Sequence, residues 1–153
     1  MRGYYGRPEA TSEVIDSDGW YATGDLAKLD AEGYLHIVGR KKDMIIRGGQ
    51  NIYPEEIETY LCSHPDIQEA AVVGIPSGLS GEQACAFIIL KPGVAMTAQQ
   101  VLDYCRAALE PYKIPSQVRF VDDFPRTATG KAQKYRLQSG MLDDSGRNTT
   151  HDR

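Results

Sequence analysis

Lys131 follows a glycine and a run of small side chains in the segment PRTATGK, residues 125–131. An ammonium group on a flexible stem is a compact positive charge, which suits phosphate oxygens and a carboxylate together. Because Gly130 and the small residues before it leave space around that stem, the segment predicts a lysine that reaches into a cleft formed with another domain. Taken alone, a lysine here is more often an ordinary surface residue, and that interpretation stays open.

Polar residues with possible ligand contacts also lie in the N-terminal third of the chain. Asp25, in YATGDL, is a turn residue on the simplest interpretation, but its carboxylate could accept hydrogen bonds from the hydroxyls of a ribose. The charged run at residues 40–42, RKK, falls between two predicted hairpins. It is either a solvated charge run or a hinge, because a polar linker has few apolar contacts that would oppose rotation.

Gly48 and Gly49 lie between two short apolar runs and predict a tight hairpin turn with positive φ angles. Glycine also lets the backbone approach a bound ligand closely, because it has no Cβ atom. Gln50 and Asn51 could donate hydrogen bonds beside that opening. The turn is therefore a candidate ligand-contact site as well as a structural one.

The elements that must position these residues mix strands and helices, which predicts a small α+β domain. We expect an antiparallel or mixed sheet flanked by helices and preceded by a hairpin segment. The predicted hairpins cover residues 21–40 and the turn at Gly48 and Gly49, and the predicted strands cover 67–75, 84–91 and 116–123. The predicted helices begin at Pro54, at the capping box of Thr97 and Gln100 (with Ala108 on its inner face), and near residue 131.

The bulk composition excludes some function classes. The formal net charge is −4, so the chain has no basic surplus for general nucleic-acid binding. No apolar run approaches the roughly 18 residues that a membrane-spanning helix requires. Cys62, Cys85 and Cys105 are isolated and do not cluster with histidines, so we expect buried thiols rather than a metal site. Unpaired cysteines fit a reducing cytoplasm.

The stretch GWYATGDLAKLDAEGYLHIVGRKKDMIIRGGQNIYPEEIE, followed at a distance by PRTATGK, closely resembles the adenylate-forming superfamily. That superfamily includes acyl-CoA synthetases, adenylation domains of nonribosomal peptide synthetases and firefly-type luciferases. The resemblance runs from Gly3 to Leu137 and covers only the C-terminal end of the family. It implies that residues 1–40 are the last piece of a large N-terminal adenylation domain, that 41–140 are its mobile C-terminal lid, and that 141–153 are a disordered tail.

The resemblance also implies roles in the adenylation step. Asp25 matches the aspartate that binds the ribose hydroxyls of ATP, and Arg40 matches an arginine that also holds the nucleotide. Lys42 falls at the position of the hinge. Lys131 matches the lysine required for adenylation.

A second group of implied roles concerns the acceptor. Gly48 and Gly49 match the loop that lines the channel for the pantetheine arm of CoA after the lid rotates. Arg106 falls where some members contact the CoA nucleotide. Ile46 stands where luciferases have a lysine, which counts against light emission.

The implied reaction is that of an acyl-CoA synthetase. A carboxylate and ATP give an acyl-adenylate and pyrophosphate, and CoA then takes the acyl group and releases AMP. The missing N-terminal domain would carry the acyl pocket and the Mg²⁺ site, so we expect this chain to be a fragment that is inactive alone. Two alternatives are a peptide-synthetase type that transfers to a carrier protein, and a non-catalytic binding or regulatory module. A lysine acetyltransferase acting on Lys131 is a further possible partner.

Overall fold

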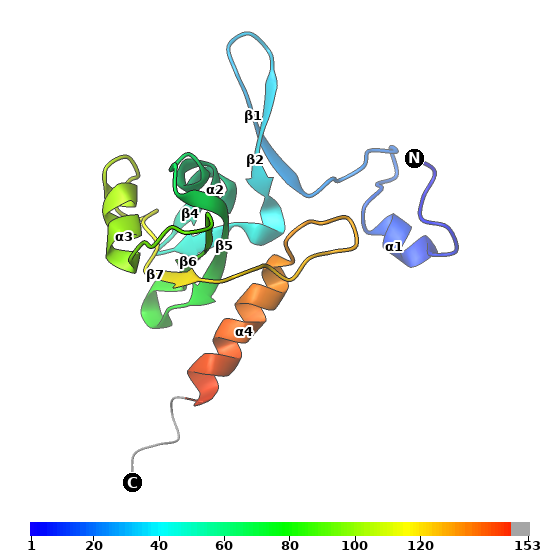
Figure 1. Ribbon diagram of the computed structural model, residues 1–153. Helices are drawn as coiled ribbons and strands as arrows, with labels where there is room; N and C mark the ends of the chain where they lie inside the picture. The colour runs from blue at the N-terminus through cyan, green and yellow to red at the C-terminus, as the bar shows by residue number, and fades with distance from the viewer. Residues whose placement is uncertain (148–153) are drawn as a thin grey trace. The chain divides into compact units, whose positions relative to one another are not determined.

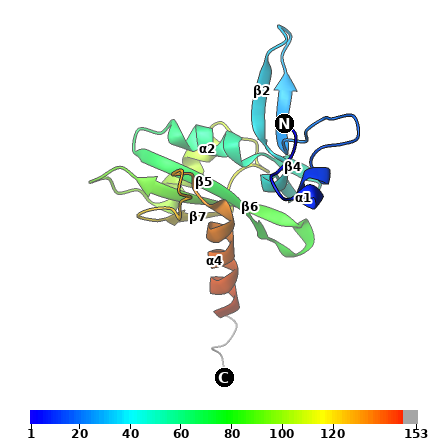
Figure 2. The same ribbon diagram turned by 90° about the vertical axis from the view of Figure 1, so that its right-hand side faces the viewer.

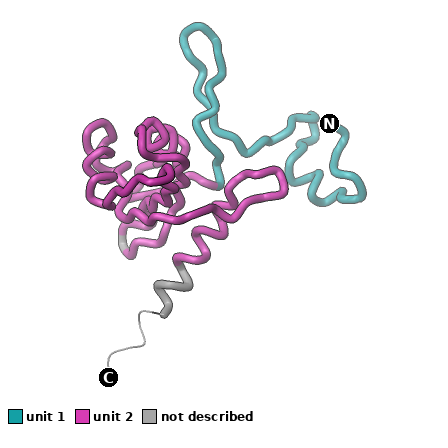
Figure 3. Tube along the Cα trace, viewed as in Figure 1, with its two compact units in different colours: residues 1–42 teal, residues 43–153 magenta. Residues whose placement is uncertain are grey.

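The computed structural model describes residues 1–147, with the backbone alone at residue 79 and from 142 to 147 (Figure 1). The chain divides into two compact units, residues 1–42 and 43–153 (Figure 3). The boundary falls directly after Lys42, inside a 3-10 turn that spans Lys41–Asp43.

The first unit is built around one antiparallel hairpin. Its elements are α1 (Pro8–Ser12), β1 (Asp25–Leu29) and β2 (Leu35–Arg40). Asp25 and Arg40 are register partners, so the ends of the two strands bring these side chains together. The hairpin is confirmed, whereas the sequence pattern did not indicate the short helix α1.

A three-stranded mixed sheet forms the centre of the second unit. Its strands are β5 (Ile67–Pro76), β6 (Glu82–Leu90) and β7 (Gln117–Phe120). The order is β5-β6-β7, with β5 and β6 antiparallel and β6 and β7 parallel. This arrangement confirms the predicted α+β class with a mixed sheet.

Both faces of this sheet are covered, as Figure 2 shows for α2 (Pro54–Cys62) and α4 (Lys134–Arg147). One face packs against α2, α3 (Ala98–Arg106), β3 (Ile45–Arg47) and β4 (Gln50–Ile52); the other packs against α4. Alternate residues of β6 divide between the two cores: Ala84, Ala86 and Ile88 face the first, and Cys85, Phe87 and Ile89 face the second. Burial on both faces explains why β5 and β6 read as nearly continuous apolar runs.

Local signals fix two of the helix starts. Pro54 is at the first turn of α2, where its missing N–H group has no helical partner to lose. Thr97 and Gln100 form the predicted capping box, in which the backbone N–H of Thr97 donates to Gln100 Oε1 at 2.8 Å and that of Gln100 to Thr97 Oγ1 at 3.3 Å. The starts of both helices are thus set by residues within a few positions of each start.

The structure corrects three expectations. Ala108 is exposed because α3 ends at Arg106, so it does not lie on the inner face of that helix. Cys62 is also exposed, at the last position of α2, whereas Cys85 and Cys105 are buried as predicted. Helix α4 continues through residues 141–147 of the predicted disordered tail, with Met141 buried in the second core, and residues 148–153 lie outside the described residues.

Candidate functional site

Asp25 and Arg40 form an ion pair at the start of β1 and the end of β2. The Nε–H group of Arg40 donates to Asp25 Oδ1 at 2.8 Å, and Nη2 donates to the backbone oxygen of Thr23 at 3.2 Å. The side chains are 34% exposed for Asp25 and 48% exposed for Arg40. An exposed carboxylate beside a fixed guanidinium can accept hydrogen bonds from a sugar while the arginine contacts an anionic group.

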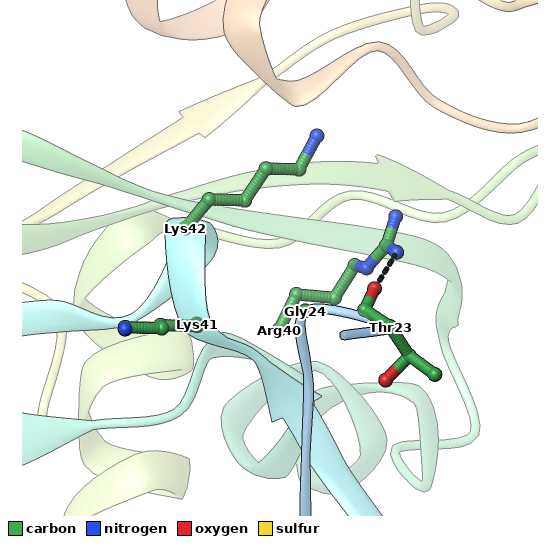
Figure 4. A pocket seen from close by; sticks show the side chains of 5 residues that line it. All are labelled: Thr23, Gly24, Arg40, Lys41 and Lys42. Carbon is green, nitrogen blue, oxygen red and sulfur yellow. Dashed lines mark hydrogen bonds between the residues drawn. The ribbon is translucent and has the colours of Figure 1, made fainter. Parts of the chain in front are cut away.

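A cavity of about 530 Å³ adjoins this pair within the first unit. Its walls are Thr23, Gly24, Arg40, Lys41 and Lys42 (Figure 4). The backbone N–H of Lys41 donates to the oxygen of Gly24 at 2.8 Å, so a hydrogen bond joins two of the residues that line the cavity. Three cationic residues and no acidic residue line it, so it favours an anionic ligand such as a phosphate.

Sequence reasoning missed Tyr21 near this pair. Its hydroxyl lies 3.4 Å from the hydroxyl of Tyr4, and that hydrogen bond raises the pKa of Tyr21. The charges of Arg40 and Asp25 also act on this hydroxyl, in opposite directions. The position of Tyr21 in the same YATGDL stretch as Asp25 is the signal that could have indicated it.

In the second unit, Gly48 and Gly49 form the two-residue turn between β3 and β4, as predicted. Their φ angles are +56° and +81°, and a Cβ atom at either position would meet nothing within 4 Å. The backbone N–H of Gly48 donates to the oxygen of Ser80 at 2.8 Å, and an Nη1 group of Arg47 donates to the oxygen of Tyr112 at 3.1 Å. The turn is therefore held from two sides but leaves open space at its tip.

Lys131 is exposed, on a loop that closes on itself. The backbone N–H of Thr127 donates to the oxygen of Lys131 at 2.8 Å, and the N–H of Lys131 donates to Thr127 Oγ1 at 3.1 Å. Gly130 takes a φ of +83°, which favours glycine at this position. Within residues 1–141, where side chains are described, the Lys131 ammonium has no ion-pair partner. Hydrogen bonds therefore close the loop, and the Lys131 charge has no ion-pair partner among the described side chains.

Arg106 is the last residue of α3 and pairs with Asp103 one turn earlier, at 2.5 Å. Both side chains are at least half exposed. A phosphate at Arg106 would have to compete with that carboxylate. The ion pair with Asp103 therefore weakens the case for Arg106 as a CoA contact. Lys131 has no such competitor among the described side chains.

The structure brings together only part of the predicted set. The first unit contains Asp25, Arg40 and Lys42. Arg40 contacts Asp25 directly and lines the same cavity as Lys42. Gly48, Gly49, Arg106 and Lys131 lie in the second unit.

Among the described side chains, in residues 1–78 and 80–141, no three or more histidine, cysteine, aspartate or glutamate side chains are grouped so that they could hold a metal ion. Within residues 1–147, the helices are all too short or too polar to cross a bilayer.

Known proteins resemble this chain in sequence. Residues 56–131 match the family described as AMP-binding enzyme C-terminal domain. The chain is 47% identical over 141 residues to the medium-chain acyl-CoA ligase ACSF2, mitochondrial, of Mus musculus, covering 92% of this chain and 23% of that protein. It is 48% identical over 143 residues to the putative acyl-CoA synthetase YngI of Bacillus subtilis, covering 94% of this chain and 26% of that protein. The chain thus spans about a quarter of the length of these relatives.

The fold is also found among solved structures. ATP-bound MatB from Rhodopseudomonas palustris matches with a TM-score of 0.85 and 41% sequence identity, covering 93% of this chain and 28% of that one.

Proposed function

The chain belongs to the family of AMP-binding enzyme C-terminal domains, and from this premise we propose that it is the C-terminal part of an ATP-dependent acyl-CoA synthetase. The observation that supports this most directly is Lys131, an exposed lysine without an ion-pair partner among the described side chains, on a loop closed by its own hydrogen bonds. The longer protein would convert a carboxylic acid, ATP and CoA into an acyl-CoA, AMP and pyrophosphate.

In the first half-reaction, an oxygen of the substrate carboxylate attacks the α-phosphorus of ATP, and the bond from that phosphorus to the bridging oxygen of pyrophosphate breaks. Negative charge accumulates around the phosphorus while the carboxylate oxygen enters and pyrophosphate leaves. A positioned cation stabilises that charge, and Lys131 supplies it by contacting the carboxylate and phosphate oxygens. Because its ammonium has no carboxylate partner in the described chain, it need not break an ion pair to do so.

The first unit would hold the nucleotide. The Asp25 carboxylate accepts hydrogen bonds from the ribose hydroxyls, and Arg40 holds its side chain in place from 2.8 Å away. The cationic cavity beside them takes the anionic part of the ligand. The described side chains form no cluster of three or more possible metal ligands, and we propose that the Mg²⁺ accompanying ATP binds the N-terminal part of the longer protein.

In the second half-reaction, the thiol of CoA attacks the acyl carbon and AMP leaves. We propose that the second unit rotates at Lys42, beside the boundary of the two units. This rotation would withdraw the Lys131 loop from the active site and bring in the turn at Gly48 and Gly49. The open space at that turn lets the backbone line the thiol channel. Arg106 would contact the nucleotide end of CoA after releasing Asp103.

The exposure of Lys131 also makes it a proposed target of a lysine acetyltransferase. Acetylation would remove the charge on which the first half-reaction depends and would stop adenylation. Mass spectrometry after incubation with a protein acetyltransferase tests this, and an unmodified Lys131 would contradict it.

We place the reaction in the cytoplasm, because Cys62, Cys85 and Cys105 are all free and free thiols fit a reducing compartment. The ACSF2 relative is mitochondrial by its name. Fractionation of cells that produce the longer protein distinguishes the two locations.

A chimera tests the proposed function. The chain replaces the matching portion of mouse ACSF2, and acyl-CoA formation is measured from a medium-chain acid, ATP and CoA. We expect the chimera to form the thioester and the truncated host to form none. A folded chimera that binds ATP but forms neither acyl-adenylate nor thioester would contradict the proposal and favour a non-catalytic module.

A further inference from the structure

Arg126 lies at the entrance of the Lys131 loop and is the most heavily engaged cation around it. Its guanidinium makes a two-pronged ion pair with Glu69 of β5, with Nη2–Oε2 and Nη1–Oε1 distances of 2.7 and 3.2 Å. Nε and Nη2 also donate to Asp123 Oδ1 at 3.1 and 3.0 Å. The hydrogen bonds to Glu69 and then to Asp123 raise the pKa of Arg126, so its charge is permanent. The loop entrance is thus tied to the central sheet.

The same guanidinium also reaches the far side of the loop. Nη1 of Arg126 donates to the backbone oxygen of Gly130 at 3.2 Å, and Gly130 directly precedes Lys131. The backbones of Arg126 and Ala132 pair as an isolated antiparallel bridge. The Arg126 side chain therefore connects β5 to the loop entrance and to Gly130.

The C-terminal end of the loop has a second anchor. Lys134, the first residue of α4, lies 2.7 Å from Glu58 of α2, and Glu58 accepts the backbone N–H of Val72 at 2.6 Å. Lys134 and Glu58 are only 23% and 17% exposed. Both ends of the loop are thus held by ion pairs. Of the two anchoring residues, Arg126 also contacts the backbone next to Lys131, whereas Lys134 pairs with Glu58.

We propose that Arg126, held by Glu69, is the positioning residue for Lys131, an inference that rests on the role proposed for Lys131 above. Gly130 has access to more backbone conformations than any other residue type. The peptide between Gly130 and Lys131 is restrained by two hydrogen bonds, from Arg126 to its carbonyl group and from its N–H group to Thr127 Oγ1. Without the first bond, this peptide rotates more readily and turns the lysine stem away. A displacement of about 1 Å at a reacting group lowers a rate by about 100-fold, so the hydrogen bond from Arg126 to Gly130 sets how often the ammonium points at its target.

The first test uses the 153-residue chain itself and needs no activity. Amide hydrogen exchange is followed by NMR in the wild type, in Arg126→Gln and in Arg136→Gln. Arg136 is an exposed arginine of α4 that bonds its neighbour Tyr135, and it is the matched control. We expect Arg126→Gln to speed exchange at the Gly130 and Lys131 amides by about tenfold or more, with the amides between β5 and β6 unchanged.

The second test uses the ACSF2 chimera and separates positioning from general stability. Arg126→Gln should slow formation of the acyl-adenylate by roughly 10–100-fold and leave the transfer from supplied acyl-adenylate to CoA within about twofold of the wild-type rate. In a Lys131→Ala background, Arg126→Gln should cause no further loss, because its effect acts through Lys131.

Unchanged exchange at Lys131 in Arg126→Gln overturns the inference, as does an equal extra loss in the Lys131→Ala background. If Lys131→Ala itself adenylates at the wild-type rate, the proposed function of Lys131 fails. The exchange result still decides whether Arg126 orders the loop in that case.

Discussion

Alanine substitution at Gly49 and at Gly93 provides a matched comparison at two left-handed positions. Gly49 has a φ of +81° in the β3–β4 turn, and Gly93 has a φ of +79° in the turn after β6; a Cβ atom at either would meet nothing within 4 Å. The two substitutions therefore introduce the same backbone strain and no clash. Only Gly49 lies in the turn proposed to line the thiol channel.

The expected stability change follows from that strain. A left-handed conformation costs a residue with a Cβ atom roughly 1–2 kcal/mol, and alanine recovers about 0.4–1 kcal/mol by restricting the unfolded chain. A net loss of about 1 kcal/mol lowers Tm by about 4 °C in a unit of this size. Thermal unfolding of the chain, followed by circular dichroism, should show the same decrease for Gly49→Ala and Gly93→Ala.

The expected activities differ. In the ACSF2 chimera, the methyl group of Gly49→Ala narrows the channel through which CoA binds. If the crowding raises the activation free energy of the transfer by about 1.4 kcal/mol, transfer to CoA slows about tenfold. Gly93→Ala should transfer at the wild-type rate, and both variants should adenylate normally. Equal transfer rates in the two variants would refute the channel role of this turn, and an unchanged Tm in both would refute the strain argument.

Three further predictions concern single contacts. Thr97→Ala removes the acceptor of the capping box and should lower the free energy of unfolding by about 1 kcal/mol; urea denaturation measures this, and an unchanged midpoint would be inconsistent with the cap. Lys42→Pro should slow transfer to CoA more than adenylation in the chimera, because proline restricts the backbone where the rotation occurs, whereas equal slowing of both steps would argue against a hinge. Burial raises the pKa of Glu58 above its ordinary 4.5, so the folded state binds this proton more tightly than the unfolded state. The stability of the wild type relative to Glu58→Gln should therefore fall as pH rises above about 4.5, and urea titrations showing the opposite slope would mean that the Lys134 charge outweighs burial.

Much of the fold could be predicted from local sequence. Glycine pairs fix a hairpin turn, and Thr97 with Gln100 fixes a helix start, because these signals act within a few residues. The length of α4 could not be predicted in this way. Its last described buried side chains, Leu137 and Met141, are held by the second core, and that core forms only when β5, β6 and the segment at Phe124 have assembled.

The candidate site shows the same limit. The short motifs indicated Asp25, Arg40 and Lys131, since each lies in a compact stretch of residues with distinctive chemistry. The pair of Arg126 and Glu69 was missed because the partners are 57 positions apart in the chain. The sequence indicated the lysine that we propose for adenylation, whereas the contacts around it required the tertiary structure.

The most direct test of the central claim measures the two half-reactions of the Lys131→Ala chimera separately. Loss of one charge-stabilising donor should slow adenylation, measured by pyrophosphate exchange into ATP, by about 10²–10³-fold. Transfer of the acyl group from supplied acyl-adenylate to CoA should stay near the wild-type rate, and Tm should change little because the Lys131 side chain is exposed. Wild-type adenylation by Lys131→Ala would contradict the account.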